Sequence, residues 1–157
     1  MDKQFLDTIK YSISGKNALL RTDYNVPLTD GKILNDERIK SSFPTIDLLW
    51  EKGVNNIIII THLGRPKGKR IPELTLEPIK KYLQYHYQNY KIYLTDLYQS
   101  QTVISKTENS IILIENIRFY PEEERKSSQI NIEKFEKKVA NLADIFVNDA
   151  FGTCHRN

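Results

Sequence analysis

The stretch "NNIIIITHLGRPKGKR", residues 55–70, sets an apolar run directly against a polar and cationic one. Its four consecutive isoleucines indicate a strand covered on both faces, because a half-exposed strand would alternate apolar with polar residues. Strands of that kind belong to parallel sheets with helices on either side. His62, Gly64 and Arg65 follow at the point where the strand must end. This junction predicts both the fold class and the location of a site.

Segments typical of strands and helices alternate along the rest of the chain. Pro44 lacks a backbone N–H, so it must begin or kink the helix predicted over 36–52, and Gly53 is the predicted stop. Such alternation predicts an α/β fold with a mostly parallel sheet and helices on both faces. No repeat or Gly/Ser-rich linker divides the chain, so one domain is expected over 1–157. The other expected segments are strands from about Ala18 and over 56–61, 91–94, 110–116 and 144–149, and helices over 74–88, capped by Thr75, and 130–143.

The overall composition argues against several classes of protein. The chain has 157 residues, of which 39% are hydrophobic and 27% charged, as is ordinary for one domain with a core. Its net charge of +3 is far from the dense basic stripe of a nucleic-acid-binding protein. Cys154 is the single cysteine, which fits a reducing compartment. No segment has the apolar core of a signal peptide or the roughly 20 apolar residues of a membrane span. A cytoplasmic monomer without nucleic-acid or membrane partners is therefore expected.

Arginine is concentrated where the strands end. Ligands of open α/β sheets bind outside the carboxyl ends of the strands, so the residues that follow each strand are the candidates. Five of the seven arginines lie in or beside four such segments, whereas the sixteen lysines are scattered. The planar guanidinium group matches carboxylate or phosphate oxygens two at a time, which predicts a small polyanionic ligand. The five residues are Arg21, Arg38, Arg65, Arg118 and Arg156.

An alternative is that each arginine pairs with a local acid such as Asp23, Glu115 or Asp149. Five cations at one edge exceed the charge of those acids, which favours a shared ligand. Arg21 is the exception, because in an extended strand it shares a face with Asp23 and is expected to orient it. Asp23 and Asn25 then offer an acceptor and a mixed donor and acceptor, suited to a substrate hydroxyl and carboxylate.

Several other motifs are incomplete. "GRPKGK" has one residue too few between its glycines for a phosphate-binding P-loop, and Arg70 stands where Ser or Thr would bind magnesium. The tyrosine- and lysine-rich segment 80–91 has the composition of a base-stacking surface, but its spacing favours a helix that covers the sheet. Cys154 and His155 are adjacent, and neighbours in sequence rarely face each other as a catalytic pair.

Four segments together resemble the N-terminal domain of phosphoglycerate kinase, in order and in spacing, over almost the whole chain. The resemblance implies a Rossmann-like three-layer α/β sandwich, in a protein of two such domains facing a cleft. It implies transfer of a phosphoryl group from ATP to 3-phosphoglycerate, giving 1,3-bisphosphoglycerate, with Mg-ATP or Mg-ADP bound by the C-terminal domain. The segments are "LLRTDYNVPLTDGKILNDERI" (19–39), "THLGRPKG" (61–68), "ILIENIRFYPEEE" (112–124) and "FVNDAFGTCHR" (146–156).

Carried over by motif, the resemblance implies a role for each candidate residue. Asp23 and Asn25 look like the pair that grips the hydroxyl and carboxylate end of the substrate, and Tyr24 and Leu63 count among the substrate-binding residues. Arg38 matches the catalytic arginine, which neutralises charge on the transferring group. The 3-phosphate is expected to be held by His62, Arg65, Arg118 and Arg156, with Gly64 allowing the loop to close on it.

The sequence departs from the family in two places. Cys154 stands where alanine is usual, a small apolar exchange. The chain ends at Asn157, inside a motif that normally continues, so a truncation before the nucleotide domain is expected. That implies no nucleotide or metal site in these residues and no turnover by the isolated chain. Two alternatives remain: a naturally short, non-catalytic anion-binding α/β module, and an RNA-associated protein that uses the tyrosine- and lysine-rich helix.

Overall fold

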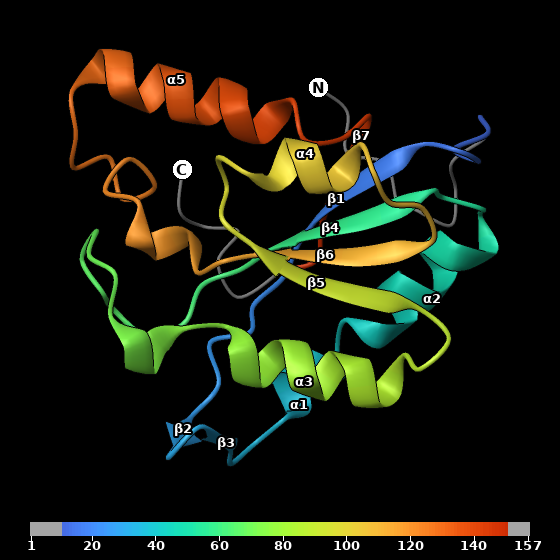
Figure 1. The fold of residues 1–157 in the computed structure, drawn as a ribbon, viewed down its shortest axis with the longest axis horizontal. Coiled ribbons are helices and arrows are strands. Elements are labelled where there is room, and N and C mark those ends of the chain that lie inside the picture. The colour runs from blue at the N-terminus through green and yellow to red at the C-terminus, as the bar shows by residue number, and fades with distance from the viewer. Residues whose placement is uncertain (1–10, 151–157) are drawn as a thin grey trace.

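The computed structural model describes residues 11–150, which surround one parallel sheet (Figure 1). Five strands pair in the order β5-β6-β4-β1-β7, and every pairing is parallel. The α/β class and the mostly parallel sheet predicted from the sequence are confirmed. The strands are β1 (Asn17–Arg21), β4 (Asn56–Ile60), β5 (Lys91–Thr95), β6 (Ser110–Ile114) and β7 (Ile145–Asn148).

The isoleucine run divides its side chains between two cores, one on each face of the sheet. All residues of β4 are buried, as are all residues of β6. Ile57 and Ile59 join one apolar cluster, and Ile58 and Ile60 join the other, because successive side chains of a strand point to opposite faces. Burial of each of these isoleucines contributes roughly 1.5–3 kcal/mol to the free energy of folding. The predicted strand covered on both faces is confirmed.

Helices cover both faces of the sheet, as predicted: α2 and α3 lie on one side, and α4 and α5 on the other (Figure 1). The helix expected over 36–52 is two helices, because Pro44 lies in the first turn of a new one. Gly53, with φ of +74°, follows the second of these, as expected of a stop. The helices are α1 (Glu37–Lys40), α2 (Phe43–Glu51), α3 (Glu77–His86), α4 (Ser100–Ile104) and α5 (Gln129–Ala140).

Some short elements were not predicted. These are α4, a two-stranded hairpin of β2 (Leu28–Thr29) and β3 (Lys32–Ile33), and 3₁₀ turns at Pro72–Leu74 and Ile117–Phe119. The predicted cap of α3 is one residue early, because Leu76 rather than Thr75 is the N-cap residue. No helix within the described residues is long and apolar enough to cross a membrane.

The order of the strands creates a crevice at the carboxyl ends of β4 and β6. These strands are neighbours, but the chain after β4 leads to β5 at one edge of the sheet, and the chain after β6 leads to β7 at the other. The connection after β4 contains α3 on one face of the sheet and the connection after β6 contains α5 on the other (Figure 1), and such a change of face between neighbouring strands is where open α/β sheets bind ligands. The segments that follow β1, β4 and β6 meet at this carboxyl edge.

Candidate functional site

Hydrogen bonds join the segment after β1 to the segment after β4. Thr61 Oγ1 donates to the carbonyl oxygen of Thr22 at 3.1 Å and accepts from the backbone N–H of Tyr24 at 2.9 Å. Asn25 Oδ1 accepts from the N–H of Gly64 at 2.9 Å. The two segments are therefore held in one arrangement by their own polar groups.

Asn116 joins the segment after β6 to the segment after β4 from inside the protein, where it is 0% exposed. Its Nδ2 donates to the carbonyl oxygens of Leu63 at 2.7 Å and Leu74 at 2.9 Å. Its Oδ1 accepts from the N–H groups of Leu63 at 3.3 Å and Arg118 at 3.2 Å. One side chain thus satisfies four backbone groups of the two connections, and it fixes how those connections face one another.

Arg38 lies in α1 and forms an ion pair with Asp23, with 2.8 Å between Nη1 and Oδ2. The Arg38 side chain is 55% exposed. Asp23 Oδ1 also accepts from the N–H of Asn25 at 3.2 Å. The expectation that Arg21 orients Asp23 is wrong, because among residues 11–150 the Asp23 carboxylate pairs with Arg38 and not with Arg21.

Arg118 is a nearly buried cation whose charge is only partly compensated. Its side chain is 10% exposed, and its Nε lies 3.7 Å from Glu123 Oε2, beyond hydrogen-bond distance. Nη1 donates to the carbonyl oxygen of Gly64 at 3.2 Å, but the buried Nε has no hydrogen-bond partner in the described part of the chain. A guanidinium group in this state is well suited to bind an anion.

Arg65 is exposed and forms no ion pair with any residue of 11–150. Local pairing therefore accounts for Arg38 and in part for Arg118, but not for Arg65.

Glu115 and Asp149, the other two local acids, do not pair with these three arginines. Glu115 accepts from Thr75 Oγ1 at 2.7 Å and from the N–H of Leu76 at 2.9 Å, and burial raises the pKa of the Asp149 carboxyl. The predicted Arg156, like Cys154 and His155, lies outside the described residues.

Tyr24 and Leu63 contribute to the core. The Tyr24 side chain is 0% exposed, its hydroxyl lies 2.7 Å from Ser42 Oγ, and burial raises the pKa of the phenol. Leu63 is buried as well. Both side chains pack in the apolar cluster below the loops. Their direct contact with a substrate stays a prediction. Gly64 is required by the backbone itself, because its φ is +63° and a Cβ would lie 2.8 Å from Leu74 Cδ2.

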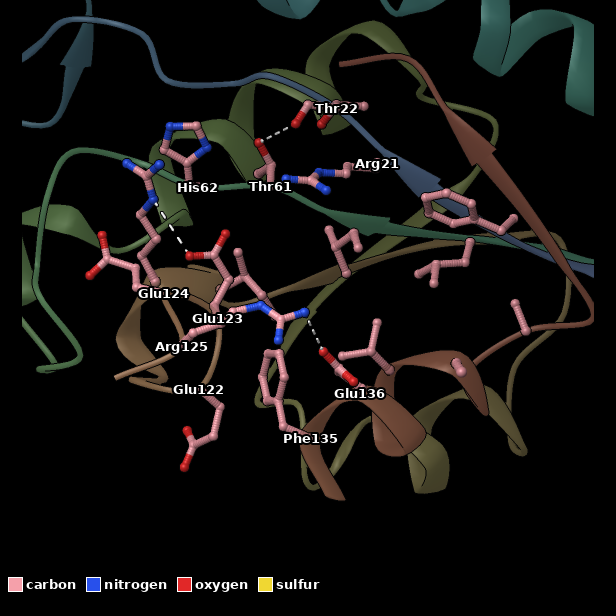
Figure 2. A pocket seen from close by; sticks show the side chains of 18 of the residues that line it. Arg21, Thr22, Thr61, His62, Glu122, Glu123, Glu124, Arg125, Phe135 and Glu136 are labelled. Carbon is pink, nitrogen blue, oxygen red and sulfur yellow. Dashed lines mark hydrogen bonds and ion pairs between the residues drawn. The ribbon is translucent and has the colours of Figure 1, made fainter. Parts of the chain in front are cut away.

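A groove opens beside this edge on the α5 side of the sheet (Figure 2). Arg21, Thr61 and His62 lie along one side of it, and the segment 122–126 and Phe135 of α5 lie along the other. Arg118 also lines the groove. The rim carries both signs of charge, since Arg125 pairs with Glu136 at 3.2 Å. The candidate anion site therefore borders a groove of mixed charge.

Within residues 11–150, no group of three or more His, Cys, Asp or Glu side chains is arranged to hold a metal ion. The acids nearest the edge already have partners, as Asp23 does in Arg38. What the described residues offer is a set of cationic and amide groups for a small anion.

A family model described as phosphoglycerate kinase matches residues 7–157. The chain belongs to the phosphoglycerate kinase family. The phosphoglycerate kinases of Dictyoglomus turgidum and Borrelia hermsii are 43% and 44% identical to it, over 98% and 96% of this chain. That of Euplotes crassus is 37% identical over 98% of the chain. This chain spans only 38% to 40% of the length of these relatives.

Solved phosphoglycerate kinases have the same fold. The structure from Coxiella burnetii matches with a TM-score of 0.74 and 35% identity, covering 94% of this chain and 36% of its own. The structure from Pyrococcus horikoshii matches with a TM-score of 0.75 and 32% identity, covering 93% of this chain and 36% of its own. The predicted family and the Rossmann-like α/β architecture are confirmed.

The sequence motifs of phosphoglycerate kinase did not point to the residues that hold the loops together. Thr61 and Asn116 were not predicted to do so, although each is a polar residue within two positions of the end of a fully buried strand. That position was the available signal, because a buried polar side chain must find hydrogen-bond partners. Asp96, which follows β5, was also missed.

Proposed function

We propose that the carboxyl edge of the sheet binds 3-phosphoglycerate, as the acid-substrate site of a phosphoglycerate kinase. The single observation that carries the proposal is the state of Arg118. Its guanidinium group is nearly buried, its nearest carboxylate oxygen is 3.7 Å from Nε, and Nε has no hydrogen-bond partner among the described residues. A buried cation costs stability unless an anion compensates it, and a phosphate group supplies that anion with several acceptor oxygens.

The phosphate end of the ligand belongs at the β4 and β6 side of the edge. Arg65 is exposed and has no protein ion pair in the described part of the chain, so it is available to close over a dianion. The carbonyl oxygen of Gly64 accepts a hydrogen bond from Arg118, which ties the two arginine-bearing loops to each other. His62, which lines the same groove, and Arg156 complete the proposed phosphate ligands.

The carboxylate end belongs at the β1 side. The side-chain Oδ1 of Asn25 accepts a hydrogen bond from the N–H of Gly64, which leaves the side-chain Nδ2–H groups to donate to the ligand. Asp23 holds Arg38 by their 2.8 Å ion pair and accepts from the glycerate hydroxyl. A carboxylate nucleophile needs no general base, so the protein contributes positioning and neutralisation of negative charge. Arg38 neutralises negative charge at the attacked phosphoryl group.

The described residues do not fit a nucleotide or its magnesium ion. The segment 64–69 has the wrong glycine spacing for a phosphate-binding loop, and no carboxylate cluster suits a metal within 11–150. We accordingly expect no turnover from the 157-residue chain in a coupled kinase assay, and rates near those of a full-length relative would contradict this assignment.

Titration of the chain with 3-phosphoglycerate, followed by amide chemical shifts, tests the proposal. The shifts should concentrate at Gly64, Arg65 and Arg118 and should saturate at millimolar ligand, while glycerate, which lacks the phosphate, should bind far more weakly. Arg65→Gln should weaken binding by roughly tenfold or more, because charge-assisted hydrogen bonds contribute about 1.5–3 kcal/mol.

Lys91→Gln is the matched control. It removes one positive charge from the start of β5, at the amino edge of the sheet, and it should leave the affinity unchanged within twofold or so. No saturable shifts with 3-phosphoglycerate, or equal losses in the two variants, would contradict a specific site at the carboxyl edge.

A further inference from the structure

The segment 64–71, which carries Arg65, is fastened to the protein in its middle. The N–H of Gly68 donates to the carbonyl oxygen of Arg118 at 3.1 Å. Gly68 has φ of +75°, and a Cβ there would lie 2.9 Å from Pro121 Cβ. The segment therefore lies directly against the chain that follows β6, and its position affects both arginines of the proposed phosphate site.

Asp96, at the carboxyl end of β5, provides a further attachment. Its Oδ1 accepts from the N–H of Tyr98 at 2.9 Å, and its Oδ2 accepts from the Tyr120 hydroxyl at 2.8 Å. The Tyr120 oxygen in turn accepts from the N–H of Leu97 at 3.1 Å. These bonds orient the carboxylate independently of the segment 64–71, since all the donors lie elsewhere in the chain.

Arg70, near the end of the segment, forms an ion pair with this oriented carboxylate. Its guanidinium carbon also lies 5.8 Å from the centre of the Phe119 ring, within the range of a cation–π contact. Only the Arg70 side chain loses conformational entropy when this contact forms, because other hydrogen bonds already orient Asp96 and Tyr120.

We propose that Asp96, Tyr120 and Arg70 form a latch that holds the segment 64–71 closed and so positions Arg65 at the carboxyl edge. The three are positioning residues and do not contact the substrate. Arg70, although it lies in the same basic stretch as Arg65, binds the protein rather than the phosphate. The effect of the latch on ligand affinity rests on the proposed function, whereas its effect on the segment does not.

The size of the effect follows from the exposure of the pair. The Arg70 side chain is 59% exposed, and ion pairs of that exposure change an equilibrium by roughly fivefold at most. Loss of the latch should therefore raise the open population of the segment by about fivefold. Apparent affinity scales with the closed fraction, so the dissociation constant for 3-phosphoglycerate should rise by a smaller factor, which approaches one where the segment is mostly closed.

Native-state trypsin cleavage measures the opening directly, because Lys67 and Lys69 lie within the segment. Cleavage after these two lysines, quantified by mass spectrometry, is expected to rise about fivefold in Asp96→Asn and in Arg70→Gln, with the double variant no worse than either single one. Arg70→Lys, which keeps the charge, should restore most of the protection. Tyr120→Phe removes one hydrogen bond to Asp96 and keeps the ion pair, so its cleavage rate should lie between those of the unmodified chain and Asp96→Asn.

Asp30→Asn serves as the matched control, because Asp30 lies in the exposed turn between β2 and β3, where its φ of +49° also suits asparagine. It should leave both cleavage and affinity unchanged. Calorimetric titration with 3-phosphoglycerate then separates two roles for Arg70. If the latch positions Arg65, Asp96→Asn weakens binding by no more than the increase in cleavage; if Arg70 were itself a phosphate ligand, freeing it from Asp96 would tighten binding.

Each outcome decides a different part of the inference. Unchanged cleavage in Asp96→Asn and Arg70→Gln would overturn the latch. Faster cleavage with tighter 3-phosphoglycerate binding would overturn its positioning role. Absence of binding by the unmodified chain would overturn the proposed function and the substrate half of the inference, while the cleavage ratios would still decide whether the latch holds the segment.

Discussion

Replacement of Asn116 by alanine tests whether one buried amide holds the carboxyl edge together. The substitution removes two short hydrogen bonds, to the carbonyl oxygens of Leu63 at 2.7 Å and Leu74 at 2.9 Å, and two longer ones at 3.2 and 3.3 Å. A buried group left unsatisfied costs roughly 1–3 kcal/mol. The two short bonds alone therefore predict a loss of about 2–6 kcal/mol, a large part of the 5–15 kcal/mol typical of a domain.

Urea unfolding followed by fluorescence measures this loss, because Trp50 is the single tryptophan and it stacks on Tyr90 with 4.3 Å between ring centroids. The matched control is Asn89→Ala at an exposed turn, where the change should stay within about 0.5 kcal/mol. A loss below about 1 kcal/mol for Asn116→Ala, or one equal to the control, would refute the conclusion that this amide fixes the loops.

Three further predictions concern backbone strain, pH and the core. Gly64→Ala should lose about 2 kcal/mol in urea unfolding, because φ is +63° and the new Cβ would press on Leu74; an unchanged midpoint would contradict the strain. The Tyr82 hydroxyl donates to Asp36 at 2.6 Å and, with Lys40, holds the pKa of that carboxyl below its ordinary 3.8. The stability that this hydrogen bond contributes is present above the ordinary pKa of Asp36 and is lost as pH falls through its lowered pKa in the folded protein. The loss of stability caused by Tyr82→Phe should therefore shrink in acid, and a loss that does not change with pH would refute the linkage. Ile58→Ala should cost about 2–5 kcal/mol and Ile58→Val about 0.5–1.5 kcal/mol by calorimetry, and equal costs would count against tight packing in the α5-side cluster.

The positions of the strands and of the edge were predictable from local sequence. The isoleucine run of β4 and the "IILI" of β6 indicate strands covered on both faces by composition alone. Parallel strands place all their carboxyl ends at one edge, so Asp23, His62 and Arg118 were expected near one another without knowledge of the strand order.

The contacts that depend on strand order were not predictable. Asn116 reaches Leu63 only because β6 lies beside β4, and that neighbourhood results from the order β5-β6-β4-β1-β7. The ion pair of Arg38 with Asp23 depends on how α1 lies against the segment after β1, and no local pattern in the sequence specifies that contact. The helix α4 has five residues, too few to display a helical period.

The position of bound 3-phosphoglycerate in a crystal of this chain tests the central claim most directly. The phosphate oxygens should lie roughly 3 Å from guanidinium nitrogens of both Arg65 and Arg118, with the carboxylate towards Asn25 and Arg38. A phosphate held instead by Arg70, or a ligand on another surface with Arg118 still facing Glu123, would contradict a shared anion site at the carboxyl ends of β4 and β6.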